Sequence, residues 1–471
     1  MAIKIKSSSF LLIGLSISVS MVSLTDSMVN VVLPYILSDL KIAFTMASWI
    51  SIAPLLLITC LIVIFGRLGD IIGRKRFIIL GITIYMVGAI LCSTSISGMF
   101  LIGYRGIQGV GSALLISNIY AIPKDVFPPH KHGQAISIIT FGIYIGLTIA
   151  PFLGGFLIDY LNWRWIFLIC LPIEIIGLII IQFTFKSKVK RFNKEKFDYI
   201  GAILLALMLL TLYLALTLGN QIGWDVLIII MFVIFGGTLI GFILSERKIE
   251  TPMIPLNLFK KLNFTTSTFA ALLFYISTMS VGFLLPIYFK VCFGYYGLII
   301  GLVLFPMPLF MSIFTPISGF LSDKFVNRKI SISGLIILFI FFIFMSFLDF
   351  NPPYSFVFLS IGGIGQGLFT AANVGMIMDS VDPRKRGIAS SISTMMRTIG
   401  QSSSYAISTA ILGVFLPFNI LNAILSGNIS LSPDQIELFT SSLHTTFLFM
   451  SFFSLSSLIL ILIQFFNKNK K

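Results

Sequence analysis

Four ionisable side chains lie inside long apolar stretches of this 471-residue chain: Asp26, Arg105, Glu174 and Arg397. They are exceptions to its composition, because charged residues make up only 10% of the sequence. If the stretches cross a lipid bilayer, a charge near the centre costs about 2.5–3.5 kcal/mol and is expected to face a partner or a water-filled cavity. Groups placed in this way can take up and release protons or bind a charged group of a ligand.

The depths of Asp26 and Arg105 predict that these two side chains interact. Asp26 lies about sixteen residues into the first apolar stretch, roughly 24 Å from its start at 1.5 Å per helical residue. Arg105 lies about six residues into the fourth stretch, which runs in the opposite direction, and so roughly 9 Å from the opposite boundary. Because the hydrocarbon core is about 30 Å thick, Arg105 lies roughly 21 Å from the boundary at which the first stretch starts. We expect a contact, direct or through water, that protonation of Asp26 would release. The alternative is a static buried pair that only orients two helices.

Glu174 and Arg397 each lie about ten residues into an apolar stretch, near the expected midplane. Glu174 could hold a cationic ligand or a second proton; the alternative is a protonated glutamate that hydrogen-bonds to a neighbouring helix. Arg397 could neutralise Glu174, bind an anionic group or pair with a backbone carbonyl. Three of the four charged residues, namely Asp26, Glu174 and Arg397, are candidates to line a ligand cavity.

The elements that must position these residues are membrane-spanning helices. Apolar residues form 57% of the chain, and a soluble protein of this length would carry roughly 25% charged residues. About 20 helical residues cross a bilayer, and the sequence contains fourteen apolar runs of about that length. They are residues 10–32, 47–66, 77–96, 99–122, 134–158, 164–185, 199–219, 224–244, 264–289, 297–320, 330–349, 354–376, 388–413 and 442–466.

The basic residues between these runs predict the orientation. Of the 32 lysines and arginines, 27 lie in the terminal and loop segments of one face and three on the other. Cytoplasmic loops carry such an excess, so both termini are expected in the cytoplasm, with the chain in the cell membrane. This asymmetry also accounts for the net charge of +15. The positive charge is therefore interpreted as topological, and no nucleic-acid partner is expected.

An internal repeat divides the chain into two halves. Residues 66–70 resemble residues 319–323, and two further short matches recur in the same order at nearly the same offset. Two parallel six-helix bundles with two inserted spans explain this spacing. We therefore expect an N-terminal bundle over 1–197, an inserted helix pair with a linker over 198–263, and a C-terminal bundle over 264–471. Such halves usually hold a ligand site at their interface near the midplane.

No segment predicts catalysis or a cofactor. The four cysteines lie in or beside apolar runs, which is typical of small core residues, and the three histidines are scattered. No glycine-rich phosphate loop is present, so energy for any transport must come from an ion gradient or from the gradient of the substrate itself. We predict no catalytic residue, no metal site and no cofactor.

The loop over residues 66–76 resembles the signature loop of the major facilitator superfamily. It holds three glycines, one carboxylate and four cations between two apolar runs. The fourteen-span layout resembles the drug:proton antiporter branch of this superfamily, which includes multidrug and quaternary-ammonium exporters. Four further stretches agree with it: residues 24–34, 105–111, 146–155 and 162–167.

The resemblance implies roles for two groups of residues. The loop would be a cytoplasmic gate whose Asp70 meets a helix N-terminus of the other half, near Gly387, and stabilises the outward-open state. A second, weaker copy of this loop begins at residue 319 and keeps two charged residues, Asp323 and Arg328. The gate residues are Gly66, Gly69, Asp70, Gly73, Arg74, Asp323 and Arg328. The antiporter-type helix, which would seal the outward side, contains Gly146, Pro151, Gly154 and Gly155.

These features together predict an all-α polytopic membrane protein of the major facilitator fold. The expected function is proton-coupled export of hydrophobic compounds, cationic or amphiphilic, by alternating access, with Asp26, Arg105 and Glu174 as proton-coupling residues. The expected partners are a small-molecule substrate, protons and the bilayer, and the protein is expected to act as a monomer. The alternatives are export of one specific metabolite, antibiotic or siderophore, and proton symport.

Overall fold

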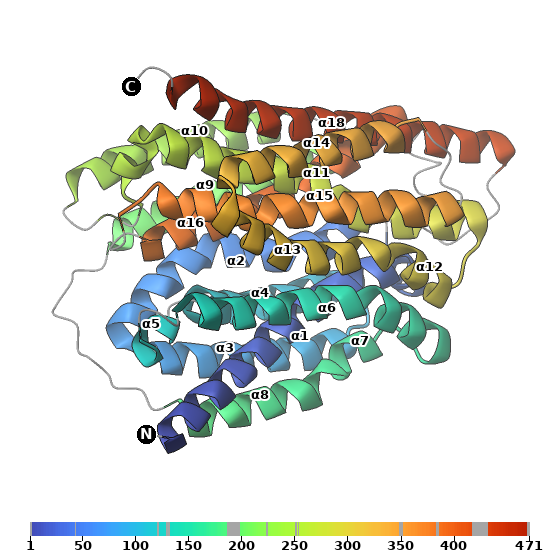
Figure 1. Cartoon of the computed structure of the whole chain (residues 1–471). Coiled ribbons are helices and arrows are strands. Elements are labelled where there is room, and N and C mark those ends of the chain that lie inside the picture. The colour runs from blue at the N-terminus through green and yellow to red at the C-terminus, as the bar shows by residue number, and fades with distance from the viewer. Residues whose placement is uncertain are drawn as a thin grey trace.

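The computed structural model describes residues 2–42, 44–119, 122–128, 132–185, 198–222, 225–249, 252, 254–347, 352–382, 386–416 and 432–468. Regular structure within these ranges is helical (Figure 1). The helices of the first half are α1 (Ala2–Leu40), α2 (Phe44–Ile72), α3 (Arg74–Ser93), α4 (Gly98–Ile119), α5 (Ile122–Val126), α6 (His132–Tyr160), α7 (Trp165–Leu168) and α8 (Cys170–Thr184).

The second half and the two helices before it follow the same pattern of long spans and short connections. These elements are α9 (Tyr199–Ile222), α10 (Val226–Lys248), η2 (Leu256–Lys260), α11 (Leu262–Phe293), α12 (Gly297–Leu304), α13 (Pro306–Lys324), α14 (Asn327–Met345), α15 (Pro352–Asp379), α16 (Arg386–Phe415) and α18 (Pro433–Lys468).

Each of the fourteen apolar runs coincides with a helix or with two helices that continue one another. The sixth run is α7 with α8, and the tenth is α12 with α13. In the described part of the chain, twelve spans are long and apolar enough to cross a membrane. The other two runs are α9, whose described apolar part is Tyr199–Ala215, and α16, which is rich in serine and threonine. The prediction of fourteen membrane-spanning helices agrees with this architecture.

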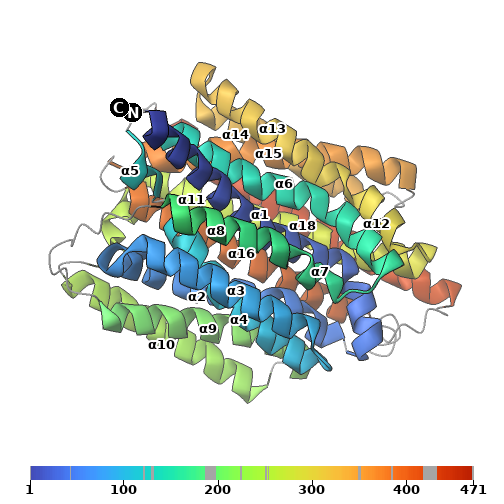
Figure 2. The same ribbon diagram turned by 90° about the horizontal axis from the view of Figure 1, so that it is seen from below.

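The helices form two groups that face each other. Helices α1 to α8 lie together in the lower part of Figure 1, and α11 to α18 lie in the upper part. The two groups meet where α1 contacts α11, α2 contacts α16, and α6 contacts α12. Helix α9 packs against α2 and α16, and α10 packs outside α9, as Figure 2 also shows. Of the predicted domain boundaries, residue 197 lies outside the described residues and residue 263 falls in the first turn of α11.

Helix α1 begins, and α18 ends, at the same end of the molecule (Figure 1). We call this the basic end, because Arg67, Arg74, Lys75 and Arg76 lie where α2 meets α3. The opposite end is called the far end. The turn at the basic end requires glycine: Gly73 has φ of 120°, a left-handed conformation that other residues rarely adopt. This geometry explains why a glycine separates α2 from α3.

Candidate functional site

A cavity of about 270 Å³ lies between the two halves, near the middle of the spans. It is lined by apolar and polar side chains in equal number, and both halves contribute to the lining. Proteins usually bind small molecules in cavities of this kind, with an apolar wall and a few convergent polar groups. The polar and charged lining residues are Ser23, Asp26, Ser27, Asn30, Ser51, Arg105, Thr140, Tyr144, Tyr275, Thr278, Gln366, Thr370, Arg397, Thr398, Gln401 and Tyr405.

Asp26 of α1 and Arg105 of α4 form an ion pair on the wall of this cavity. Arg105 Nη2 donates to Asp26 Oδ1 at 2.7 Å. The contact that the sequence predicts is therefore present. The two partners differ in exposure, since the Arg105 side chain is 1% exposed and the Asp26 side chain 32%. The carboxylate is consequently the member of the pair that a proton or ligand in the cavity can reach.

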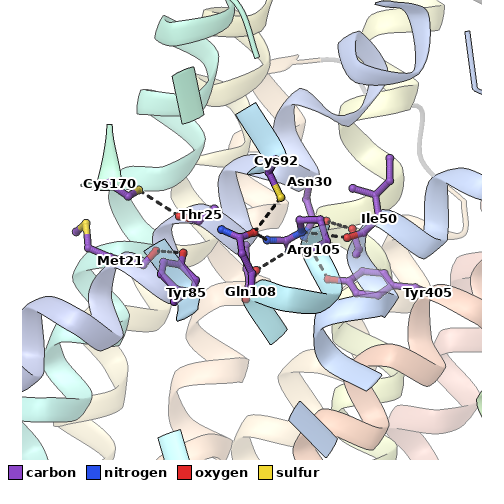
Figure 3. Close-up of polar contacts among 12 residues, drawn as sticks. Met21, Thr25, Asn30, Ile50, Tyr85, Cys92, Arg105, Gln108, Cys170 and Tyr405 are labelled. Atoms are coloured by element: carbon purple, nitrogen blue, oxygen red, sulfur yellow. Dashed lines mark hydrogen bonds and ion pairs between the residues drawn. The ribbon is translucent and has the colours of Figure 1, made fainter. Parts of the chain in front are cut away.

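Arg105 keeps further hydrogen bonds behind the ion pair. Its Nε donates to the Ile50 carbonyl at 3.2 Å, and its Nη1 donates to Gln108 Oε1 at 2.8 Å (Figure 3). The Cys92 thiol donates to the same Gln108 oxygen at 3.6 Å. Because a buried guanidinium is costly without acceptors, these contacts hold Arg105 in place independently of Asp26. The arrangement allows the pair to open by movement or neutralisation of Asp26 alone.

A hydrogen bond connects the two halves one helical turn beyond Asp26. The Asn30 amide donates to the Tyr405 hydroxyl at 3.2 Å, and Ser51 donates to the Asn30 side-chain oxygen at 2.9 Å (Figure 3). Asn30 lies in the stretch 24–34 that resembles the family, but no role is predicted for it or for Tyr405 from the sequence. Its spacing of four residues from Asp26 places both on one face of α1, and this spacing is the signal that could have identified Asn30.

Arg397 lines the cavity from α16, in the half opposite Asp26. It interacts with Tyr275 of α11, which also lines the cavity. Gln401 and Tyr405 follow Arg397 at intervals of four residues and face the same space. On α16, the residues that line the cavity are Arg397, Thr398, Gln401 and Tyr405, and they form its polar cavity face.

Glu174 does not lie in the cavity, contrary to the expectation that it could contact a ligand there. It is fully buried on α8, at 0% exposure, and neither carboxylate oxygen has a hydrogen-bond partner in the described part of the chain. Gly177 of α8 approaches Gly14 and Ser18 of α1 closely, so this face of α8 is covered by α1. The Ser18 hydroxyl is a nearby polar group, but it makes no hydrogen bond of normal geometry to Glu174. Neutralisation of Glu174 by Arg397 is therefore not seen.

Helix α6, which carries the predicted antiporter-type residues, contacts both halves. At Gly146, an added Cβ would collide with the Ser20 carbonyl of α1. Further along, Gly155 contacts the backbone of Gly297 at the start of α12, and the Pro151 carbonyl contacts Gly301. Gly154 packs on Met28. Small residues allow this close approach of helices in membranes, and here they join α6 to α1 and to α12.

The predicted gate residues are placed only in part. Gly66 and Gly69 lie in the last turns of α2, Arg74 opens α3, and Arg328 lies in the first turn of α14. The side chains of Asp70 and Asp323 and the surroundings of Gly387 lie outside the described part. The contact expected between Asp70 and the helix near Gly387 therefore stays a prediction.

Comparisons with known proteins agree with this architecture. The sequence pattern of the Major Facilitator Superfamily matches residues 15–405. The chain is 30% identical over 402 residues to multidrug resistance protein 3 of Bacillus subtilis, covering 84% of this chain and 78% of that protein. It is 32% identical over 409 residues to a riboflavin transporter of Clostridioides difficile, covering 86% and 87%.

The fold also matches solved structures. A bacterial homologue of the human lysosomal transporter Spinster, crystallised in an inward-facing and unoccupied conformation, aligns with a TM-score of 0.71 at 16% identity. The alignment covers 97% of this chain and 96% of that one. At this identity the match concerns the fold alone. With the sequence matches, it shows that the chain is a multi-pass transport protein that belongs to the major facilitator superfamily, in a drug-efflux-like branch.

Proposed function

We propose that this protein is a proton-coupled exporter that moves hydrophobic and amphiphilic compounds out of the cell by alternating access. The observation that carries the proposal is the ion pair between Asp26 and Arg105 on the wall of a cavity shared by both halves. An ionisable pair inside a membrane protein is retained at a cost and is typical of proton and substrate pathways.

The mechanism follows from the unequal burial of the pair. A proton that reaches Asp26 through the cavity neutralises the carboxylate and weakens its contact with Arg105, which stays bonded to Gln108 and Ile50. Loss of this contact changes the relative free energies of two access states, which is how a bound proton biases an equilibrium. A proton gradient can supply the energy for export, because one charge that moves through a membrane potential of 100 mV supplies about 2.3 kcal/mol.

The neighbouring contact between Asn30 and Tyr405 would pass this change to the second half. Asn30 is on the same helix face as Asp26, and Tyr405 belongs to α16. A shift of α1 after protonation alters a hydrogen bond that joins the halves. In this mechanism, residues 1–197 and residues 264–471 move as two bundles relative to each other. The inserted helix pair over residues 198–263 packs beside them and moves with them.

Glu174 is proposed as a second proton site that does not touch the substrate. Its carboxyl group is fully buried, and neither oxygen has a hydrogen-bond partner among the described residues. Burial of an unpaired carboxylate in an apolar contact favours the neutral form. Release of its proton would therefore require α8 and α1 to separate or water to enter between them.

The proposed orientation places the basic end in the cytoplasm of the cell, with both termini there, and assigns the gate residues to that side. Lysine- and arginine-rich loops support this direction. The proposed transporting unit is the monomer, because the cavity is lined by the two halves of one chain.

Export of one specific metabolite is the second candidate function. The riboflavin transporter of Clostridioides difficile is 32% identical to this chain, and the cavity contains several groups that can form directed hydrogen bonds. Arg397, on the wall opposite Asp26, would bind a polar or anionic part of such a substrate. A substrate recognised by hydrogen bonds is discriminated more strongly than one held by apolar contact alone.

Transport into inverted membrane vesicles tests the proposal. We expect an imposed proton gradient to drive uptake of an ethidium-like cation or of a neutral dye, and Asp26→Asn to reduce gradient-driven uptake by about a hundredfold. Asp39→Asn is the matched control, because Asp39 lies on the same helix and its partners are Trp163 and Arg164 at the far end.

The outcomes separate the candidates. Full gradient-driven uptake by Asp26→Asn at equal expression would contradict the coupling role. Uptake of riboflavin without uptake of any dye would support the specific-metabolite function. Proton movement in the same direction as the substrate would identify a symporter.

A further inference from the structure

A carboxylate joins the two halves at the far end of the molecule. Asp159 lies in the last turn of α6, and its Oδ1 accepts a hydrogen bond from the Gly297 N–H at 2.9 Å. Its Oδ2 accepts one from the Leu298 N–H at 2.7 Å. Gly297 and Leu298 are the first two residues of α12. Asp159 therefore contacts the N-terminus of a helix that belongs to the other half.

The physical basis of this contact is the unsatisfied start of a helix. The first N–H groups of an α-helix have no partner within the helix, and together they carry a partial positive charge. A carboxylate that accepts two of them satisfies both donors and interacts favourably with the helix dipole. Since α12 continues into α13, the two form one 26-residue span from Gly297 to Ser322. Asp159 thus holds the end of a complete span.

The surrounding contacts require the far end to be closed. Gly155 and Gly297 touch through their backbones, and a Cβ at either position would collide with the opposite helix. Nearby, Lys290 of α11 donates to the Pro34 carbonyl of α1 at 3.2 Å and lies 3.9 Å from the centre of the Tyr35 ring. Separation of the halves at this end would break all of these contacts together.

We propose that Asp159 is a gating residue of the far end, whose carboxylate latches the N-terminus of α12 and is released when this end opens. The proposal rests on the alternating access proposed above, but it does not depend on the substrate or on proton coupling. It gives the far end the same kind of contact that the family resemblance implies for Asp70 at the basic end, a carboxylate on a helix N-terminus of the other half. Each latch would stabilise one access state.

The chain contains a matched control for this proposal. Asp39 is a second carboxylate at the far end, and it bonds Arg164 Nη1 at 3.0 Å and Trp163 Nε1 at 2.8 Å. Both partners belong to the same half as Asp39. Removal of its charge therefore loses a contact of similar type without separating the halves.

The test measures distances between spin labels by pulsed electron resonance, on full-length protein whose native cysteines are replaced. One label pair, at Ile96 and Val414, reports on the far end across the halves; both side chains are exposed there, at 81% and 77%. A second pair, at Phe183 and Val326, reports on the basic end. Asp159→Asn and Asp39→Asn are compared with the parent protein, each after a check that it elutes as a single species.

We expect Asp159→Asn to raise the ratio of far-end-open to far-end-closed molecules by about fivefold. The label pair at the basic end should show a matching increase in its short distances, and Asp39→Asn should leave both distributions unchanged. An unchanged far-end distribution in Asp159→Asn would overturn the proposal. So would an equal effect of Asp39→Asn, or far-end opening without closure of the basic end, because each of these results describes local loosening and not a gate.

Discussion

Asp26 and Glu174 are two acidic residues that lie deep within membrane-spanning helices of the same half. Asp26 belongs to α1, and Glu174 lies on α8, which packs against α1. Their surroundings differ. Asp26 is paired with Arg105 at 2.7 Å and is 32% exposed to a cavity, whereas Glu174 is fully buried between α8 and α1 with neither oxygen hydrogen-bonded in the described residues. The comparison shows that depth in the membrane does not determine the role of an acidic residue. The deciding factor is what its side of the helix faces.

The largest effect is expected from breaking the ion pair. In a double-mutant cycle of Asp26→Asn and Arg105→Gln, the interaction energy in the free energy of unfolding should be about 2 kcal/mol. The reason is that removal of Asp26 leaves the buried Arg105 without a counter-charge, although its hydrogen bonds to Ile50 and Gln108 remain. Thermal unfolding in detergent of the four proteins measures it. An interaction energy near zero would mean that the two residues are neighbours without significant coupling.

A smaller effect is expected at Glu174. Glu174→Gln keeps the shape of the side chain and removes the ionisable group, so its midpoint of thermal unfolding should match the parent protein or exceed it slightly. The cycle with Ser18→Ala should give an interaction energy below about 0.5 kcal/mol, since no hydrogen bond joins the two side chains. A large loss of stability in Glu174→Gln would instead indicate that the carboxylate has a partner.

An effect smaller than that of the ion pair is also expected from the contact between the halves near Asp26. Tyr405→Phe removes only the hydroxyl that accepts a hydrogen bond from Asn30, and should change stability by about 1 kcal/mol or less. Its effect should appear in the maximal transport rate more than in the substrate concentration at half rate. Phe283→Leu is a useful control, because Phe283 packs on the Tyr405 ring without this hydrogen bond. Equal effects of both changes would assign Tyr405 a packing role only.

Much of the fold could be predicted because hydrophobicity and length determine where a chain crosses a membrane. Each of the fourteen apolar runs coincides with helical structure, including α16, where Arg397 and many serines interrupt the apolar pattern. The contact between Asp26 and Arg105 could also be predicted, because their depths agree and a buried charge needs a partner. The same reasoning made Glu174 a candidate for the cavity but could not decide between the cavity and a buried contact with a neighbouring helix, because equal depth does not fix the rotation of a helix about its axis.

Asp159 illustrates the same limit at the end of a helix. Its position at a span boundary is unremarkable in the sequence, since a carboxylate there can remain in water at little cost. Its partners, Gly297 and Leu298, are 138 and 139 residues away along the chain. Only the packing of α6 against α12 brings them together.

The sequence by itself determined which segments span the membrane, how deep each charged residue lies and which end of the molecule is basic. These properties depend on local composition, because each span must satisfy its own backbone hydrogen bonds in lipid. The tertiary structure decided which residues share the cavity, that Glu174 is buried away from it and which carboxylate joins the two halves. These properties depend on helix rotation and on contacts between distant segments, and both are set by the packing of all the helices together.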